Sequence, residues 1–276
     1  MAAVRRVVAI ASGKGGVGKT TVAVNLALGL VQRGYRVGLL DADVHGPNVP
    51  LMLGVRRRTD VGGWQAIVPV GFASEQIAAQ RLPALERHGL KIMSIGLLVG
   101  ENQATLVDNA SVVGLLIRQL LTLVDWGELD ILLIDFPPGT GEPQATVLTT
   151  VHLDGVVLVI TPQDVARLDT SRALAAFRQV GVPIVGVVEN MSYLLCPSCG
   201  DRIDVFHRGH AERPIGDEAI PVLAAFPIEP TISAAADLGR PVVIGMPESA
   251  QAAIFLDLAA TVAARLDLDH ADDRDI

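Results

Sequence analysis

The sequence has 276 residues, half of them apolar, with 30 acidic and 22 basic side chains, a formal net charge of −8 and two cysteines. The apolar content allows a sizeable core, whereas two cysteines cannot form a disulfide framework in a chain of this length and favour a reducing, cytoplasmic compartment. The acidic balance argues against nucleic acid or a membrane as partner, and each long apolar stretch is interrupted before the roughly 18 residues that a membrane span needs.

The first apolar run, RVVAIAS, leads directly into a glycine loop, so it is interpreted as a strand and not as a signal peptide. Further runs rich in Val and Ile predict strands buried on both faces: YRVGLLDAD, LKIMSIGLLV, DILLIDF, GVVLVITP, PIVGVVENM and VLAAFPI. Several of these predicted strands are separated by segments whose apolar residues recur at helical spacing, for example at 20–33 and 168–179. The alternation predicts an α/β fold, with a doubly wound, mostly parallel sheet and helices on both faces.

One domain is expected over residues 1–268, followed by an acidic tail at 269–276. Residues 55–90 break the strand and helix rhythm and are expected to form an irregular insertion or short β structure. Residues 193–214 contain both cysteines and are predicted to be a metal-binding segment.

The loop after the first strand satisfies the pattern G-x-x-x-x-G-K-[ST] between a strand and a helix, which predicts a P-loop NTPase fold. Glycines let backbone N–H groups approach phosphates closely, Lys19 would neutralise the β- and γ-phosphates, and the Thr20 hydroxyl would ligate Mg²⁺. The expected nucleotide-binding residues of this loop are Gly13, Lys14, Gly15, Gly16, Val17, Gly18, Lys19, Thr20 and Thr21.

Three aspartates are predicted at the carboxyl ends of strands, where open α/β sheets bind ligands. Asp135 is expected to hold a magnesium-bound water. Asp41 and Asp43 alternate along the chain, so they are expected to point to opposite sides and to have different roles. The segment PPGTGE at 137–142 follows Asp135 and is suited to sensing the γ-phosphate.

The motif KGGVGKTT, from Lys14 to Thr21, resembles the deviant Walker A group of P-loop ATPases. The resemblance implies that Lys14 reaches the nucleotide of the partner subunit in a homodimer. It also implies that Asp43 orients the attacking water, that Asp41 supports the magnesium shell, and that Asn190 reads adenine, which favours ATP. Lysines, magnesium and a water-orienting aspartate suffice for slow hydrolysis.

Three blocks narrow the resemblance to the Mrp/ApbC-type iron–sulfur cluster carrier ATPases: DADVHGPNVPLMLG, DFPPGTGEPQATVLTT with TPQDVARLDTSRA, and GVPIVGVVENMSYLLCPSCG. The similarity extends from about Val7 to Leu266. The chain departs from the family pattern at 104–117, where a W-R-G-P block is usual, and at 205–216, where a glycine-rich run is usual. The dimer contacts and the target surface are therefore expected to differ.

Cys196 and Cys199 form a C-x-x-C pair that fits a redox dithiol, half of a metal site or a chance spacing. A thioredoxin-like dithiol would need a helix N-terminus in another βαβ setting. A symmetric dimer would bring two pairs together, and the four thiolates could hold a bridging [4Fe–4S] cluster. His207 and His210 offer an alternative, an intrachain zinc site, although their spacing is tight.

The leading hypothesis is thus an ATP-hydrolysing homodimer that receives a cluster from assembly proteins and delivers it to apo iron–sulfur proteins. The alternative is a positioning or partition ATPase with a structural zinc site. That class needs a basic amphipathic terminal helix or a basic stripe, whereas residues 249–270 have few basic side chains and an acidic end.

Overall fold

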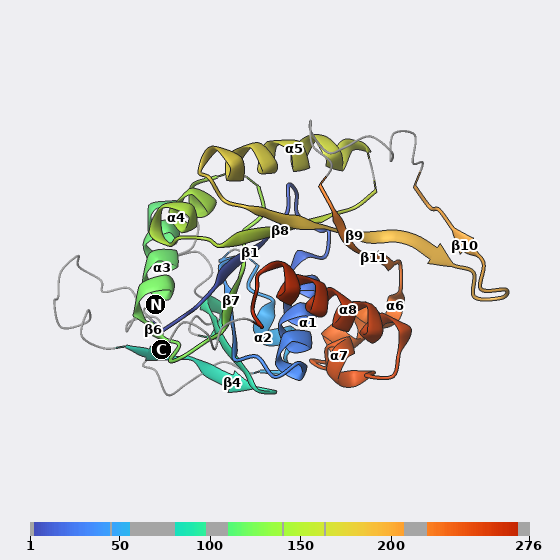
Figure 1. Ribbon diagram of the computed structural model, residues 1–276, viewed down its shortest axis with the longest axis horizontal. Coiled ribbons are helices and arrows are strands. Elements are labelled where there is room, and N and C mark those ends of the chain that lie inside the picture. Colours follow the sequence, from blue (N-terminus) through green and yellow to red (C-terminus); the bar gives the residue numbers. More distant parts are fainter. Residues whose placement is uncertain are drawn as a thin grey trace.

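The computed structural model describes residues 3–44, 46–55, 81–97, 110–139, 141–162, 164–206 and 220–269. Its main sheet has the strand order β10-β9-β8-β1-β7-β2-β5-β4, with β11 also paired to β9 (Figure 1). The strands that run parallel are β1 (Val7–Ala11), β2 (Val37–Asp41), β5 (Leu90–Ser94), β7 (Ile131–Asp135), β8 (Gly155–Ile160), β9 (Ile184–Leu195) and β11 (Val222–Pro227). The edge strands β4 (Leu85–Arg87) and β10 (Arg202–Ile203) are antiparallel to their neighbours.

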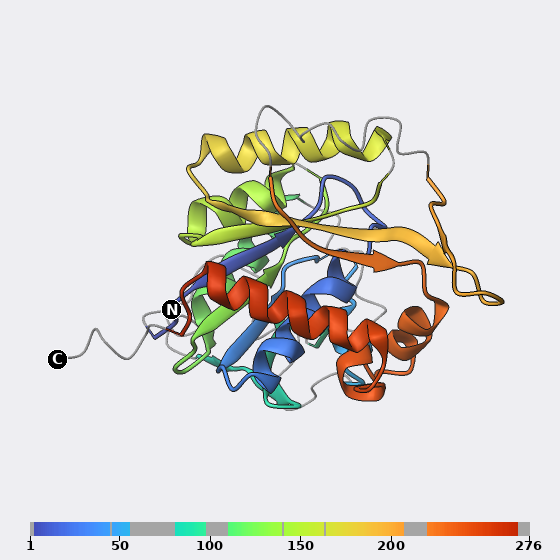
Figure 2. The same ribbon diagram turned by 45° about the vertical axis from the view of Figure 1, so that its right-hand side comes forward.

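Alternate residues of the central strands enter two separate apolar clusters, which is why both faces of these strands are hydrophobic. On β1, Val7 and Ala9 belong to one cluster, whereas Val8 and Ile10 belong to the other. The first cluster lies under α3 (Ala110–Leu123), α4 (Glu142–Thr150) and α5 (Asp164–Gln179), and the second under α1 (Lys19–Gln32) and α8 (Ala250–Arg265) (Figures 1 and 2). The predicted α/β architecture is confirmed.

Short elements connect this framework. They are the helices α2 (Val49–Met52), α6 (Pro230–Asp237) and α7 (Val242–Gly245), and the strands β3 (Leu82–Pro83) and β6 (Val124–Asp125), which pair with each other. Within the expected insertion at 55–90, Leu82–Pro83 and Leu85–Arg87 form short strands, and 56–80 lie outside the described residues.

The predictions for the strands LKIMSIGLLV and PIVGVVENM were wrong at their carboxyl ends. The predicted run LKIMSIGLLV leaves the sheet after Ser94 and continues as a 3-10 helix at Ile95–Leu97, because the Ser94 hydroxyl turns back to Asp41 and accepts the N–H of Gly96. Strand β9 instead extends beyond Met191 to Leu195, because β10 and β11 pair with its second half. As a result, a hairpin of β9 and β10 projects past the helices (Figures 1 and 2).

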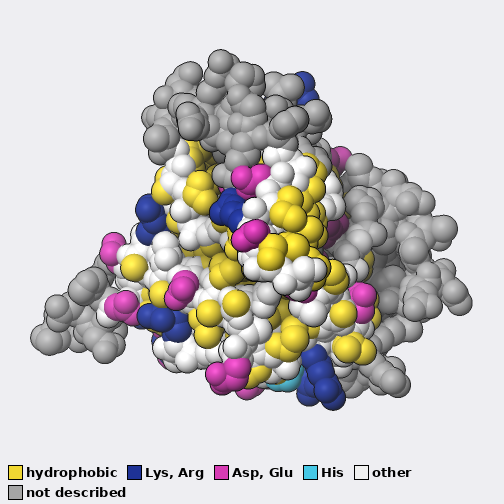
Figure 3. Space-filling model, turned by 90° about the vertical axis from the view of Figure 1, so that its right-hand side faces the viewer, with side chains coloured by type: hydrophobic (Ala, Val, Ile, Leu, Met, Phe, Trp, Pro, Cys, Tyr) yellow, Lys and Arg dark blue, Asp and Glu magenta, His cyan; other side chains and the backbone are white. Residues whose placement is uncertain are grey.

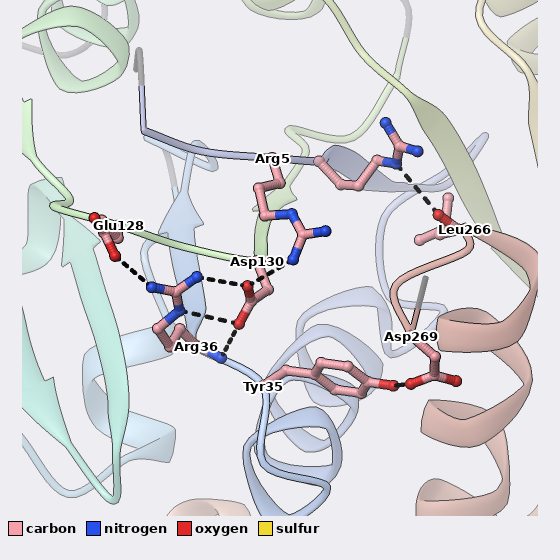
Figure 4. A network of polar contacts seen from close by, with 8 residues as sticks. Arg5, Tyr35, Arg36, Glu128, Asp130, Leu266 and Asp269 are labelled. Carbon is pink, nitrogen blue, oxygen red and sulfur yellow. Dashed lines mark hydrogen bonds and ion pairs between the residues drawn. The ribbon is translucent and has the colours of Figure 1, made fainter. Parts of the chain in front are cut away.

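At the amino ends of β2 and β7, a network of polar contacts joins the strands (Figure 4). The Asp130 carboxylate accepts hydrogen bonds from the Arg36 guanidinium and backbone N–H, and from Arg5. Tyr35 donates to Asp269, the first residue of the predicted tail. Within the described ranges, no helix is both long and apolar enough to cross a lipid bilayer.

Candidate nucleotide site and cysteine hairpin

The glycine loop lies between β1 and α1, at the centre of the carboxyl edge of the sheet. Gly16 and Gly18 have φ angles of 78° and 83°, in the left-handed region that favours glycine. A Cβ atom on Gly18 would also lie 2.2 Å from Nδ2 of Asn190. The loop backbone therefore requires glycine at 18 for conformation and for space, and α1 begins directly after it with its N–H groups at the loop.

Lys19 and Thr20, the first residues of α1, both donate to the carboxylate of Asp135 at the end of β7. The Lys19 Nζ atom lies 2.6 Å from Oδ1 and the Thr20 Oγ1 atom 2.7 Å from Oδ2. Parallel pairing of β1 with β7 places Ile10 opposite Asp135 and so brings these groups together. Burial raises the pKa of Asp135, while Lys19 and Thr20 oppose that shift by stabilising the carboxylate.

Asp41 and Asp43 differ in environment, but the expected strand alternation is not the reason and was wrong, because residues two positions apart on a strand share one face. Strand β2 ends at Asp41, which is fully buried, whereas Asp43 follows the strand and its side chain is 15 % exposed. The Asp41 carboxylate accepts hydrogen bonds from the N–H groups of Asp43 and Val49 and from the Ser94 hydroxyl. These bonds bend the chain out of the sheet, so the expectation that the strand persists to Asp43 was wrong.

Burial, and next the charge of Asp135, raise the pKa of Asp41 to about 8. The Asp43 carboxylate lies 3.8 Å from the Lys19 ammonium. The three predicted aspartates are therefore grouped around Lys19, but only Asp43 and Asp135 approach it within ion-pair distance. Among the residues that the structure describes, no three His, Cys, Asp or Glu side chains gather as a metal site.

A cavity of about 280 Å³ lies over the glycine loop. Lys14, Lys19, Thr20 and Asp43 line it, together with residues that the sequence did not single out. The unforeseen lining residues are Ser12, Asn48, Met52 and Met191, and Pro138 comes from the predicted phosphate-sensing segment. Thr140 of that segment lies outside the described residues.

A second cavity, of about 350 Å³, adjoins the first, because Gly18, Thr21, Met52 and Met191 line both. Its other walls come from Asn190, from the end of β11 and the segment that follows it (Pro227, Ile228 and Glu229), and from α6 (Pro230, Ile232, Ser233, Ala236 and Asp237). The Asn190 Nδ2 atom donates to the carbonyl of Val17 at 2.8 Å. Asn190 thus connects β9 to the glycine loop at the boundary of the two cavities.

The two cysteines occupy the turn between β9 and β10, at the tip of the projecting hairpin. The turn is closed by hydrogen bonds from the Cys196 N–H to the Asp201 carbonyl and from the Gly200 N–H to the Cys196 carbonyl, both 2.8 Å. Hydrogen bonds from the N–H groups of Cys199 and Ser198 lower the pKa of Cys196. Both cysteines are free thiols, and Cys199 is exposed.

The hairpin also carries exposed apolar side chains, Leu195, Ile203 and Val205. On this end of the molecule, apolar surface is interspersed with charged side chains (Figure 3). The Arg202 guanidinium stacks over the Tyr193 ring at 4.3 Å and stiffens the hairpin. His207 and His210, the alternative zinc ligands, lie outside the described residues.

Sequence reasoning found the loop and its acidic partners but missed Met52 and Met191. Both lie inside blocks that carry the family resemblance, but neither was singled out, because no local pattern distinguishes a cavity methionine from a core methionine. The cavity wall at 227–230 was also missed, because it meets the loop only through the pairing of β11 with β9.

The chain is similar to known proteins over most of its length. The family model for ParA, described as NUBPL iron-transfer P-loop NTPase, matches residues 3–263. An iron–sulfur cluster carrier protein of Pyrococcus abyssi is 42% identical over 265 residues, covering 94% of this chain and 86% of its own length. One from Aquifex aeolicus is 40% identical over 257 residues, covering 93% of this chain, which spans 66% of that relative.

Among solved structures, a nucleotide-binding protein from Archaeoglobus fulgidus in complex with ADP has a TM-score of 0.69 and 34% sequence identity. The match covers 92% of this chain and 93% of that one. The family resemblance inferred from the sequence motifs is confirmed by these findings: the chain belongs to the ParA/NUBPL family of iron-transfer P-loop NTPases.

Proposed function

We propose that this protein is a slow, magnesium-dependent ATP hydrolase that carries an iron–sulfur cluster as cargo and transfers it to apoproteins. The observation that carries the proposal is that one strand, β9, leads from the nucleotide cavities to a turn with two free thiols. The names of the relatives and of the matching family support it. Cluster assembly proteins and apo iron–sulfur proteins are the proposed partners.

The phosphates are proposed to lie in the cavity over the glycine loop. The loop N–H groups and the N-terminus of α1 would hold them, and Lys19 would neutralise their charge. Because Lys19 already contacts two carboxylates, at 2.6 Å and 3.8 Å, its position is set before a phosphate arrives. Such preorganisation suits phosphoryl transfer, which depends mostly on positioning and charge neutralisation.

Magnesium fits the donor set at this site. The Thr20 hydroxyl and the Asp135 carboxylate, 2.7 Å apart, offer oxygen ligands, and Mg²⁺ commonly uses one or two such groups together with phosphate and water. When bound, the ion would neutralise charge on the β- and γ-phosphate oxygens. Asp41 would support this shell from behind by holding the backbone of Asp43 through a hydrogen bond.

Hydrolysis is assigned to Asp43 and Lys14. The exposed part of Asp43 faces the phosphate cavity, where its carboxylate can orient a water molecule. Lys14 lines the cavity of its own chain, and its backbone carbonyl accepts a hydrogen bond from the Ser12 hydroxyl. We propose that in the homodimer the Lys14 side chain reaches the partner's nucleotide, so that turnover requires two chains.

The second cavity is proposed to hold the adenine base. Its walls are largely apolar, which suits a purine ring, and Asn190 offers one polar side chain at the boundary. The Asn190 amide nitrogen binds the Val17 carbonyl, so its Oδ1 atom is oriented by that bond and can accept a hydrogen bond from the exocyclic amine of adenine. A guanine would present a carbonyl oxygen there instead.

The cargo is proposed to bind at the hairpin tip. Each chain offers Cys196 and Cys199, and backbone N–H groups already stabilise the thiolate of Cys196. A [4Fe–4S] cluster needs four thiolates, so a two-fold dimer would supply two from each chain.

Anaerobic reconstitution with ferrous iron and sulfide tests the carrier assignment. We expect about four irons and four sulfides per dimer, and loss of the cluster in Cys196→Ala and in Cys199→Ala, because each removes an anionic ligand. Ser198→Ala is the matched control, since it changes the same turn, keeps the backbone N–H and leaves both thiols. Its cluster should form normally and pass to an apo [4Fe–4S] acceptor protein.

One zinc ion per chain, without sulfide and dependent on His207 and His210, would contradict the carrier assignment and support a structural zinc site. The ATPase proposal would not be affected by this result, because measurements of nucleotide binding and hydrolysis test it separately.

A further inference from the structure

Met191 has a backbone conformation that is unusual for its residue type. Its φ angle is 54°, in the left-handed region, although it is neither glycine nor asparagine and lies within strand β9. In this region the Cβ atom of an L-residue approaches the following carbonyl oxygen, so the conformation is strained. Strained residues persist where the surrounding structure holds them, and they gather at binding sites and switch regions.

The strain coincides with an irregularity in the sheet. Strand β8 pairs with β9 as far as Glu189, and β11 pairs with Glu189 and then with Tyr193, with a register shift between these two pairs. Residues 190–192 therefore form a bulge, which bends the strand between its sheet half and its hairpin half. The buried Ser192 hydroxyl donates to the Glu189 carboxylate across the bulge, at 3.1 Å.

Met191 lines both cavities of the candidate nucleotide site. Its neighbour Asn190 is bonded to the glycine loop through Val17. Cys196, at the start of the cysteine turn, lies five residues further along the chain, directly after the end of β9. A change of φ at residue 191 would therefore move the hairpin relative to the glycine loop.

A second contact ties the same hairpin to the cavity wall. The N–H of Ile228, a lining residue of the second cavity, donates to the carbonyl of Tyr193 at 2.6 Å. Tyr193 in turn packs against Arg202 on the other strand of the hairpin. The hairpin is thus held at its base by two groups that both border the cavities, Met191 and Ile228.

We infer that Met191 is a positioning residue that couples an adenine nucleotide in the site to the accessibility of the cysteine turn in the same chain. The inference rests on the proposed nucleotide and cysteine sites. A nucleotide that packs on the Met191 side chain stabilises the strained conformation described here, and this holds the hairpin in one orientation. A ligand shifts an equilibrium between two hairpin orientations only if its affinity for them differs. Contact of the nucleotide with Met191 provides this difference in affinity.

Thiol alkylation tests the coupling without a cluster. The rate of modification of Cys196 and Cys199 by iodoacetamide is measured anaerobically at one pH, with and without Mg²⁺ and a non-hydrolysable ATP analogue. In the wild type we expect the nucleotide to change the alkylation rate at least about fivefold, the lower end of ordinary coupling between sites. Calorimetry on the same samples reports nucleotide binding separately.

Two variants separate the side chain from the backbone strain. Met191→Gly removes both, and glycine adopts positive and negative φ with similar ease, whereas Met191→Ala removes the side chain and keeps the strain. Both should bind the nucleotide through Lys19 and the glycine loop, yet show alkylation rates that no longer respond to it. Met191→Leu, which keeps a large apolar side chain, should restore most of the response.

Met52→Ala is the matched control, because Met52 lines both cavities but lies on α2, without a strand that leads to the cysteines. It should weaken binding and, at saturating nucleotide, keep the fivefold response. Repeating the assay at a tenfold lower protein concentration identifies any contribution from self-association.

A wild-type protein that binds the nucleotide but alkylates at an unchanged rate overturns the inference and leaves the proposed function standing. A full response in Met191→Gly and Met191→Ala overturns it as well. Failure of the wild type to bind the nucleotide contradicts the proposed function itself, and the coupling with it.

Discussion

The Lys19 ammonium and the Asp135 carboxylate form a buried ion pair of 2.6 Å between the first turn of α1 and the end of β7, across 116 positions of the sequence. The side chains are 6 % and 0 % exposed, so neither charge has much water around it. A buried pair of this kind tolerates the loss of one partner poorly, since the other charge is left without compensation.

We predict that Lys19→Ala loses measurable ATP affinity in calorimetry, because the phosphate cavity then lacks its central cation. The free energy of unfolding at pH 8 should fall by about 3 kcal/mol, measured with urea. At pH 5 the loss should be smaller, since burial raises the pKa of Asp135 and lets an unpaired carboxyl take up a proton. Lys14→Ala, in the same loop, should unfold like the wild type, and unchanged ATP affinity in Lys19→Ala would refute the site.

The proposed action of Lys14 across the dimer predicts complementation. Lys14→Ala and Asp43→Ala should each bind ATP but hydrolyse it at least about tenfold more slowly, since each lacks one group that acts on the transition state. A mixture should recover part of the activity, because a mixed dimer contains one composite site with both groups. Phosphate release measured across mixing ratios checks this, and no recovery despite demonstrated mixed dimers would place the action of Lys14 within its own chain.

Asn190 is predicted to determine the preference for adenine. In Asn190→Ala the ratio of ATP to GTP affinity should fall by about tenfold, the effect of one hydrogen bond in a binding site. Affinity for both nucleotides should also decrease modestly, because the Asn190 amide supports the Val17 carbonyl of the loop. Competition binding with the two nucleotides measures the ratio, and an unchanged ratio would assign base selection to other residues.

The network around Asp130 predicts a specific acid dependence of stability. Hydrogen bonds from the Arg36 side chain are the largest cause that lowers the pKa of Asp130 to about 2. A carboxyl with a lowered folded-state pKa contributes stability above its unfolded pKa, near 4, and the contribution disappears as the pH falls towards 2. Asp130→Asn should therefore cost about 2 kcal/mol at pH 7 and progressively less below pH 4, as measured by urea unfolding.

Glu128→Gln is the control for this experiment, because Glu128 contacts the same Arg36 but its side chain is 78 % exposed. Exposed ion pairs contribute little to stability, so Glu128→Gln should change the free energy of unfolding by less than about 0.5 kcal/mol, both at pH 7 and at acidic pH. A cost in Asp130→Asn that stays constant from pH 7 to pH 2.5 would show that lost packing, and not the carboxylate charge, is responsible.

The sequence by itself determined the α/β class, the glycine loop and the identity of the acidic and sulfur-bearing residues. These features depend on local chemistry: the Val- and Ile-rich strands must be buried on both faces, and the spacing of glycines, Lys19 and Thr20 fixes a phosphate loop within nine residues. The pairing of Cys196 with Cys199 is also a local feature, because only two residues lie between them and one turn can hold both thiols.

Only the tertiary structure decided which of these groups meet. Pairing of β1 with β7 brings Asp135 into contact with Lys19. Strand β2 ends at Asp41, so Asp41 and Asp43 occupy different environments although they are only two positions apart. The left-handed conformation of Met191 and the cavities around it depend on β8 and β11, which pair with β9 from remote parts of the chain. A methionine carries no local preference for such a conformation, so only the packing of distant strands can impose it.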